Sequence, residues 1–348
     1  MLFFVLLMNT ALAQQPVIVR TVSATPVRVS KLKPGDKLRL QVQSSVGPCG
    51  ESLPKDSAIE LTVDRIEKGR GAAWWRHLLG FISVLPAPER APRKVVARSE
   101  KLDVTVAEVY RPKQAVAKGQ KARKIAGSVV VLEARGKFAS AGVASAGPVT
   151  VPAGTQANVV LLERLTASRA VDGQLFQAMV VDPVMVGDKV AIPAGALIDG
   201  KVTRSVPPRR LRRAGALSLR FHQLRQGTGI EVAAALSGAE AEGPPVSIDR
   251  EGRITSKQQI HKMVIDTAIA YVSGKVIDDL IEEGAKGIWG ATAAGSAETA
   301  ARYVGLGVGV GFFLAQRGPD VLVPRYAPMQ VAFTRAFVAD AGRVCPAN

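Results

Sequence analysis

The sequence predicts a mainly β protein: an antiparallel sandwich or barrel with a helical hairpin inserted before its last strand, plus a smaller N-terminal β unit. Over residues 149–236, short segments that alternate apolar and polar residues are separated by Gly- and Pro-containing turns, with no helical pattern between them. From about residue 255 the apolar spacing becomes that of a helix, and strand-like alternation returns at residues 321–337.

Composition places the chain among globular proteins with anionic partners. Its 348 residues suffice for two domains, and 47% hydrophobic with 22% charged residues favours a packed core over disorder. The net charge is +17, from 46 Lys and Arg against 29 Asp and Glu. Three His and two Cys leave too few ligands for a zinc or iron–sulfur site built from these residues.

The N-terminus has the pattern of an export signal. Residues 2–8 are apolar, and Ala11-Leu12-Ala13 is the A-x-A pattern that signal peptidase accepts, so we expect residues 1–13 to be a signal peptide. No Lys or Arg precedes the apolar stretch, and the alternative is a buried N-terminal strand or helix. Export to the periplasm or cell envelope would place Cys49 and Cys345 in an oxidising compartment, where we expect them to form a disulfide.

Residues 14–135 form the predicted N-terminal β unit. Alternation places Leu38, Leu40 and Val42 on one face of a strand, and residues 59–66 and 94–110 alternate in the same way. Residues 127–132 are an apolar strand. Residues 136–148 are rich in Gly, Ala and Ser, which is typical of a linker.

Residues 149–338 form the predicted barrel or sandwich domain, followed by a tail at 339–348. Thr255 or Ser256 is a helix cap at the start of the helical insertion 255–317, whose second half is rich in Gly and Ala. Val149-Thr150-Val151-Pro152 is repeated as Val321-Leu322-Val323-Pro324, so we expect the last strand to pair with residues 149–165 or a neighbour. The segment 192–198 is similar to 53–59, which suggests that the β unit occurs twice, with a degenerate first copy.

The order of these motifs resembles a known architecture. The V-x-V-P-A-G-T segment, the strands around residues 174–180 and 189–202, the basic turn and the late insertion are similar to the C-terminal β-barrel of the conjugal-transfer or type IV secretion outer-membrane core scaffold. They also resemble uncharacterised exported bacterial proteins with VPAGT and IPAG repeats. The resemblance implies a barrel and, for the scaffold, a homo-oligomeric ring. Arg325-Tyr326-Ala327 departs from it by replacing Ala-Gly-Thr in the final copy.

Motifs for catalysis and cofactor binding do not occur in the sequence. We find no G-x-S-x-G, G-x-x-x-x-G-K-[ST], H-E-x-x-H or C-x-x-C, and His77, His222 and His261 lie in different segments. We therefore expect no enzyme activity, no cofactor and no metal. The acidic run 278–283 suits either a Ca²⁺ ligand set or a solvated helix end, and a single helix supplies too few ligands for the former.

Clustered arginines provide the clearest candidate binding site. They lie around Pro207-Pro208, which we expect to protrude from the sheet because proline cannot donate ladder hydrogen bonds. We expect an anionic envelope component or membrane surface as partner, and no nucleic acid, because no aromatic residues interleave with the charges. The alternative is that the charges only keep the protein soluble. The candidate polyanion-binding residues are Arg204, Arg209, Arg210, Arg212 and Arg213.

Two aromatic segments are candidates for membrane contact. Trp74, Trp75 and Phe81 lie among arginines, as at a membrane interface, and Phe312 with Phe313 ends the Gly-rich half of the insertion. A buried loop is the alternative for the first segment, and a hairpin covering one end of the barrel is the alternative for the second. The sequence thus predicts an exported, non-catalytic structural or binding protein of the cell envelope, with an oligomeric scaffold subunit as the alternative and an enzyme of unknown class as the third interpretation.

Overall fold

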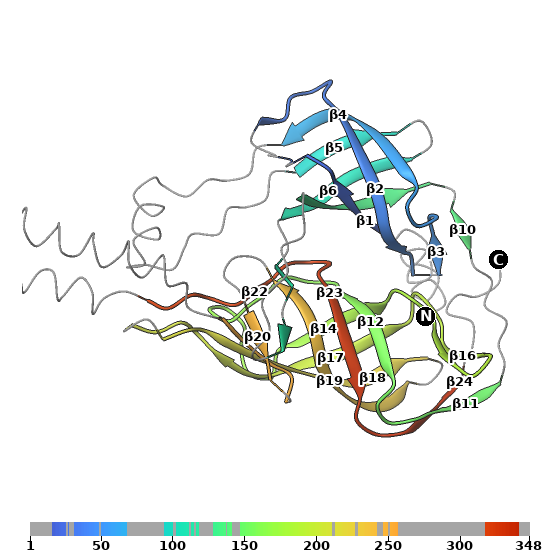
Figure 1. Cartoon of the computed structure of the whole chain (residues 1–348), viewed down its shortest axis with the longest axis vertical. Helices are drawn as coiled ribbons and strands as arrows, with labels where there is room; N and C mark the ends of the chain where they lie inside the picture. The colour runs from blue at the N-terminus through green and yellow to red at the C-terminus, as the bar shows by residue number, and fades with distance from the viewer. Residues whose placement is uncertain are drawn as a thin grey trace, which may run out of the picture.

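The computed structural model describes residues 16–25, 27, 31–48, 50–67, 94–99, 102–110, 113–114, 116–117, 128–136, 138–140, 147–210, 213–226, 229–241, 246–249, 251–256 and 317–340. These residues form β-strands and turns, and no α-helix occurs among them. The prediction of a mainly β protein with barrel-like sheets is therefore confirmed. The strands build two barrels, which lie one above the other in Figure 1.

The first barrel closes through six antiparallel strands, each paired with the next along the chain. They are β1 (Val17–Ser23), β2 (Lys37–Val46), β4 (Ala58–Glu67), β5 (Lys94–Arg98), β6 (Asp103–Tyr110) and β9 (Ser128–Arg135), which pairs back to β1. The predicted alternation is confirmed, because Leu40 and Val42 in β2 and Leu61 and Val63 in β4 are buried in the barrel core.

The second barrel repeats this arrangement. Its strands are β12 (Gln156–Leu161), β14 (Leu175–Val180), β17 (Leu197–Val206), β18 (Ala216–Arg225), β19 (Ile230–Ala241) and β23 (Pro328–Phe333). Pairing of β18 with β19, and of β23 with both β19 and β12, closes the circle. Phe176 and Phe221 meet edge to face in the core, with ring centroids 5.4 Å apart. A Cβ atom at Gly200 would overlap the Phe176 ring, so this strand position requires glycine.

The last strands pair as the repeated V-x-V-P segment predicts. Besides the β12–β23 pair, β11 (Pro148–Val151) pairs with β24 (Phe337–Asp340), and β13 (Leu165–Thr166) pairs with β22 (Leu322–Val323). All three pairs are antiparallel. The prediction that residues 321–337 return to the strand at 149–165 is confirmed.

One turn recurs in front of four strands. In residues 54–57, 152–155, 193–196 and 324–327, the fourth residue donates its backbone N–H to the first carbonyl at 3.2–3.3 Å. The third residue has positive φ in every copy: Asp56, Gly154, Gly195 and Tyr326. Its N–H bonds to a neighbouring strand, from Asp56 to Val42 in the first barrel and from Gly195 to Val180 in the second. Each of the two six-stranded barrels thus contains this turn, which is the feature that the similarity of residues 53–59 and 192–198 reflects.

In an antiparallel barrel of this kind, every second connection between successive strands lies at the same end of the barrel. In the first barrel, residues 24–36, 68–93 and 111–127 connect strands at one end, and in the second barrel 162–174, 207–215 and 242–327 do so. We call this the insertion end, and the other the opposite end. The insertion ends face the same way, because β7 (Lys113–Gln114) of the first barrel pairs with the last residues of β19. In Figure 1 the insertion end lies at the left, near β20 (Val246–Ile248) and β22.

An apolar contact joins the two barrels. The first barrel contributes outward-facing residues of β1, β2 and β9, namely Ile18, Val46, Val129 and Val131. The second barrel contributes Val160, Met179 and Tyr326. The strands β1 and β9 are consequently buried on both faces, and this explains their nearly continuous apolar sequence. At the opposite end Gly195 approaches Gly47 so closely that a Cβ atom would lie 2.6 Å from the Gly47 carbonyl oxygen.

Three polar contacts surround this apolar patch. Arg20 Nη2 donates to both carboxylate oxygens of Glu240 at 2.9 Å, and Arg164 forms an ion pair with Glu108 at 2.7 Å. The third contact centres on Glu133, which accepts the Tyr326 hydroxyl at 2.7 Å and pairs with Arg325 at 2.9 Å. Arg325-Tyr326, the departure from the repeated turn, therefore supplies contacts to the first barrel.

Two predicted boundaries are wrong in detail. Within the predicted linker 136–148, β10 (Ala139–Ser140) pairs with β3 (Glu51–Ser52), and Phe138 packs on the first core, so these residues belong to the first barrel. Thr255 and Ser256 are the last two residues of β21 (Arg253–Ser256), and they pair with β18 and β20. The insertion therefore starts no earlier than residue 257. The helical hairpin predicted for the insertion falls at residues 257–316, outside the described residues.

Candidate functional site

The structure brings four of the five predicted arginines to the insertion end of the second barrel. Arg204 lies near the end of β17, and Arg209, Arg210 and Arg213 lie in the connection to β18. All four are exposed, and within the described ranges none of them forms an ion pair. Arg212 lies outside the described residues. We call the connection 207–215 the basic turn.

The basic turn is held by the chain that returns from the insertion. Gly318 donates its backbone N–H to the Arg209 carbonyl at 3.1 Å, and an isolated bridge joins Arg210 to Arg317. Pro208 is buried. The turn lies outside the named strands and its described arginines are exposed, but it is fixed at its base by residues 317–318. The two prolines lack N–H groups, but neighbouring carbonyls accept hydrogen bonds and fix the loop.

Both flanks of the insertion lie beside the basic turn. Ser256, the last described residue before the insertion, donates its N–H to the Gly215 carbonyl at 3.3 Å. Gly215 donates its own N–H to the Pro319 carbonyl at 2.9 Å, just after the insertion. Residues 257–316 thus leave and re-enter the barrel at the base of the basic turn.

The connections at the two ends of the barrels differ in their content of charged residues. At the insertion end, the sequences of residues 24–36, 68–93, 111–127 and 207–215 each contain more Lys and Arg than Asp and Glu. Of the other two connections at this end, 162–174 contains equal numbers and 242–327 contains one more acidic than basic residue. At the opposite end, residues 47–57 and 181–196 contain more Asp and Glu. Lys and Arg are therefore more frequent in the sequences of most connections at the insertion end than in those at the opposite end.

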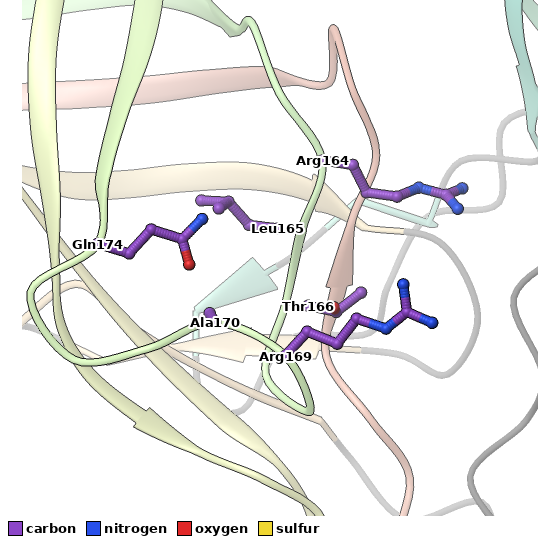
Figure 2. Close-up of a pocket in the computed structure, with 6 residues that line it drawn as sticks. All are labelled: Arg164, Leu165, Thr166, Arg169, Ala170 and Gln174. Carbon is purple, nitrogen blue, oxygen red and sulfur yellow. The ribbon is translucent and has the colours of Figure 1, made fainter.

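A small cavity lies next to the basic turn, in the connection between β12 and β14. It has a volume of about 250 Å³ and is lined by Arg164, Leu165, Thr166, Arg169, Ala170 and Gln174. Figure 2 shows the guanidinium groups of Arg164 and Arg169 directed to the same side, away from Gln174. Small-molecule pockets usually measure roughly 300–1,000 Å³. The cavity is smaller than this, and one of its lining residues, Arg164, is already paired with Glu108 at 2.7 Å.

The other predicted site residues lie outside the described residues. These are Trp74, Trp75, Phe81, Phe312 and Phe313 of the membrane-contact prediction, and Cys49 and Cys345 of the predicted disulfide. The topology nevertheless fixes where two of their connections begin and end. The connection that contains Trp74 joins β4 to β5, and the one that contains Phe312 joins β21 to β22, both at the insertion end.

Two exposed cations on the wall of the second barrel were not predicted from the sequence. Lys201 in β17 lies directly opposite Arg220 in β18. The sequence did indicate that both side chains point outwards, because they occupy the polar positions of strands with a recognised alternating pattern. Arg164 and Arg169 were also missed, since nothing in the local sequence shows that a loop between strands will close a cavity.

Comparisons with known proteins supply no family for this chain, since no protein-family model and no curated protein matches it. Among the described residues, no helix is long and apolar enough to cross a bilayer. In the same residues, His, Cys, Asp and Glu side chains nowhere gather in groups of three or more that could hold a metal ion.

Proposed function

We propose that this chain is an exported structural or binding protein of the cell envelope that binds an anionic envelope component through its basic turn, without catalysis. The observation that carries the proposal is the basic turn itself. Three exposed arginines, Arg209, Arg210 and Arg213, are gathered on a loop that backbone hydrogen bonds hold in place. A preorganised cluster of this kind loses little conformational entropy when it binds.

The chemistry of arginine supports an anionic partner. A guanidinium group presents donors in a planar fork that fits two oxygens of a phosphate or carboxylate. Exposed charges attract over about 8–10 Å at physiological ionic strength, so binding through them weakens as salt is added. The concentration of Lys and Arg on the insertion end orients that end towards a negatively charged partner.

Sedimentation with lipid vesicles tests the proposal. The wild type is expected to sediment with vesicles of anionic lipid but not with neutral vesicles, and to be released by salt. Changing Arg209, Arg210 and Arg213 together to Ser is expected to abolish most of this binding. The matched control changes Lys55, Lys189 and Arg335, three exposed cations of the opposite end, to Ser and removes the same net charge.

The comparison between the two triple variants decides the result. If the opposite-end variant loses as much binding as the basic-turn variant, net charge alone governs attraction and the proposed site is refuted. Binding that is indifferent to salt contradicts the electrostatic account as well.

A ring-forming scaffold subunit is the alternative function. It is supported by the order of elements, in which a long insertion separates the final strand from the rest of the barrel, as in the scaffold that the sequence resembles. The size of the purified protein separates the two proposals. A ring sediments as one large species at all working concentrations, whereas a binding module can sediment as a monomer.

The helical character of the insertion is part of both proposals. It is supported by the apolar spacing in the first half of residues 257–316. Circular dichroism tests it: replacing residues 257–316 by a short Gly-Ser linker should remove the helical signal and leave the β signal. A chain that shows no helical signal before the replacement contradicts the proposal.

A further inference from the structure

Two like charges face each other on the outer wall of the second barrel. Lys201 of β17 and Arg220 of β18 occupy the same cross-strand position, and both are exposed. Like charges directly opposite one another on a sheet are destabilising. Among the residues that the structure describes, no carboxylate forms an ion pair with either side chain. An anion bound between them would relieve the repulsion.

This pair continues towards the basic turn as a stripe. A β-bulge between Val202 and Arg204 adds one residue to β17, and it leaves both Thr203 and Arg204 exposed. The exposed cations therefore run from Lys201 and Arg220 past Arg204 to the arginines of the basic turn. At the rise of an extended strand, the eight steps from Lys201 to Arg209 span roughly 25 Å.

Nearby carboxylates are engaged in other contacts. Asp172 accepts the backbone N–H of Ser205 at 2.6 Å, which fixes the adjoining turn. Asp199, further along β17 towards the opposite end, accepts Arg225 at 2.6 Å and Gln177 at 3.0 Å. The β17–β18 hairpin thus has its ion-paired charges towards the opposite end, whereas towards the insertion end its described cations form no ion pair and Asp172 is the neighbouring carboxylate.

Apolar residues border the stripe on both sides. Across from Lys201 on β14 lies Leu175, and across from Arg220 on β19 lies Ala235. Leu175 is 66% exposed. The cationic band is therefore one cross-strand pair wide and several residues long, a shape that matches a chain of negative charges better than a broad charged surface.

We propose that a linear polyanion, with phosphate or carboxylate groups at regular spacing, lies along the β17–β18 hairpin from Lys201 and Arg220 to the basic turn. This inference rests on the proposed function, because it names the class of ligand for the same basic site and extends that site along the barrel wall. Lys201 and Arg220 are its binding residues in the wall.

Long-chain inorganic polyphosphate is the probe for the test. Changing Lys201 and Arg220 together to Gln is expected to weaken its binding by about tenfold at low salt. Each lost phosphate contact lowers the slope of log K against log salt concentration, so the double variant should lose roughly 1.4 from that slope. The control changes Lys55 and Lys189 to Gln, which removes the same charge at the opposite end and is expected to keep the wild-type affinity and slope.

Thermal unfolding shows whether the double variant is folded and supplies an independent test. Without ligand, the Lys201→Gln/Arg220→Gln protein is expected to melt at or above the wild-type temperature, because a repulsion is removed. Polyphosphate should raise the melting temperature of the wild type more than that of the double variant. A double variant that melts clearly lower than the wild type overturns the inference, because Lys201 and Arg220 would then stabilise the free protein instead of repelling each other.

Binding to anionic vesicles distinguishes a polymer ligand of the wall from a membrane ligand. The double variant is expected to bind vesicles of phosphatidylglycerol as the wild type does, because vesicles are contacted through the basic turn. Parallel loss of vesicle and polyphosphate binding would mean that the wall contacts a membrane and would overturn the polymer proposal. If the double variant binds polyphosphate like the wild type while the basic-turn triple variant does not, the stripe is refuted and the proposed function stands. If the wild type binds neither probe, both fail.

Discussion

Tyr326 shows how one residue can join two barrels. It occupies the turn position that glycine fills in two other copies, with φ of +61°, and its side chain is only 3% exposed. Its ring packs in the contact between the barrels, with the Arg325 guanidinium 4.3 Å from the ring centroid, and its hydroxyl donates to Glu133. Burial, followed by the hydrogen bond to Glu133 and its negative charge, raises the pKa of Tyr326 well above its ordinary value.

The raised pKa of Tyr326 predicts a pH dependence of stability. Above about pH 10 the unfolded chain loses this proton while the folded chain keeps it, so the free energy of unfolding falls as pH rises. Changing Tyr326 to Phe should lower the unfolding free energy by about 1.5 kcal/mol at neutral pH, through loss of a hydrogen bond to a charged group. The difference between the two proteins should shrink above about pH 10, as measured by urea unfolding at several pH values. A difference that stays constant with pH would contradict this account.

The contribution of Tyr326 could not be predicted from the sequence. The departure Arg325-Tyr326 was visible within the repeat, but its partner Glu133 lies 193 residues earlier and on the other barrel. By contrast, the exposure of Arg204, Arg209, Arg210 and Arg213 followed directly from their charge. Lys201 and Arg220 were predictable as outward residues, but their facing one another depends on the register of β17 and β18.

At the scale of elements, the recurring turn was the most readable feature of the sequence. A Pro residue followed by Gly two positions later predicted the turns at 152–155 and 193–196, and the strands after them began where expected. The insertion boundary was less predictable. Thr255 and Ser256 are good helix caps in isolation, but pairing of β21 with β18 and β20 keeps them in a strand.

Two turn glycines allow a matched test of the contact between the barrels. Gly154 and Gly195 have nearly the same φ, +88° and +85°, but a Cβ atom at Gly154 would meet nothing within 4 Å, whereas one at Gly195 would meet the Gly47 carbonyl. Changing Gly154 to Ala should cost about 1 kcal/mol for the backbone conformation alone. Changing Gly195 to Ala should cost about 1–3 kcal/mol more, because the turns must separate. Chemical unfolding of both variants measures the difference, and equal losses would show that the close approach contributes nothing.

At the scale of the whole molecule, the structure consists of two six-stranded barrels that share an interface. The apolar sequence of residues 127–132 predicted a strand but not which surface covers it. That surface consists of Val160, Met179 and Tyr326 from the second barrel, so it exists only after both barrels have formed. Local patterns predict each strand, whereas the packing of one barrel on the other depends on residues distant in sequence.

The Arg20–Glu240 pair tests the coupling of the barrels. Arg20 is 5% exposed, and its guanidinium contacts both oxygens of Glu240 across the interface. Changing Arg20 to Met should lower the unfolding free energy by about 3–5 kcal/mol, because Glu240 would be left with an uncompensated charge. Changing Arg20 and Glu240 together to Met should give a protein closer to the wild type than Arg20→Met is. A double-mutant cycle measures this coupling, and strictly additive losses would contradict the interface described above.

The central claim is that the insertion end of the second barrel is the binding surface of this protein. Chemical modification of arginine, detected by mass spectrometry with and without anionic vesicles, tests it most directly. The account predicts protection of Arg204, Arg209, Arg210 and Arg213 when vesicles are present. It predicts unchanged modification of Arg98, Arg225 and Arg335, which are exposed near the opposite end. Equal protection of both sets, or protection of the opposite-end set alone, would contradict the claim.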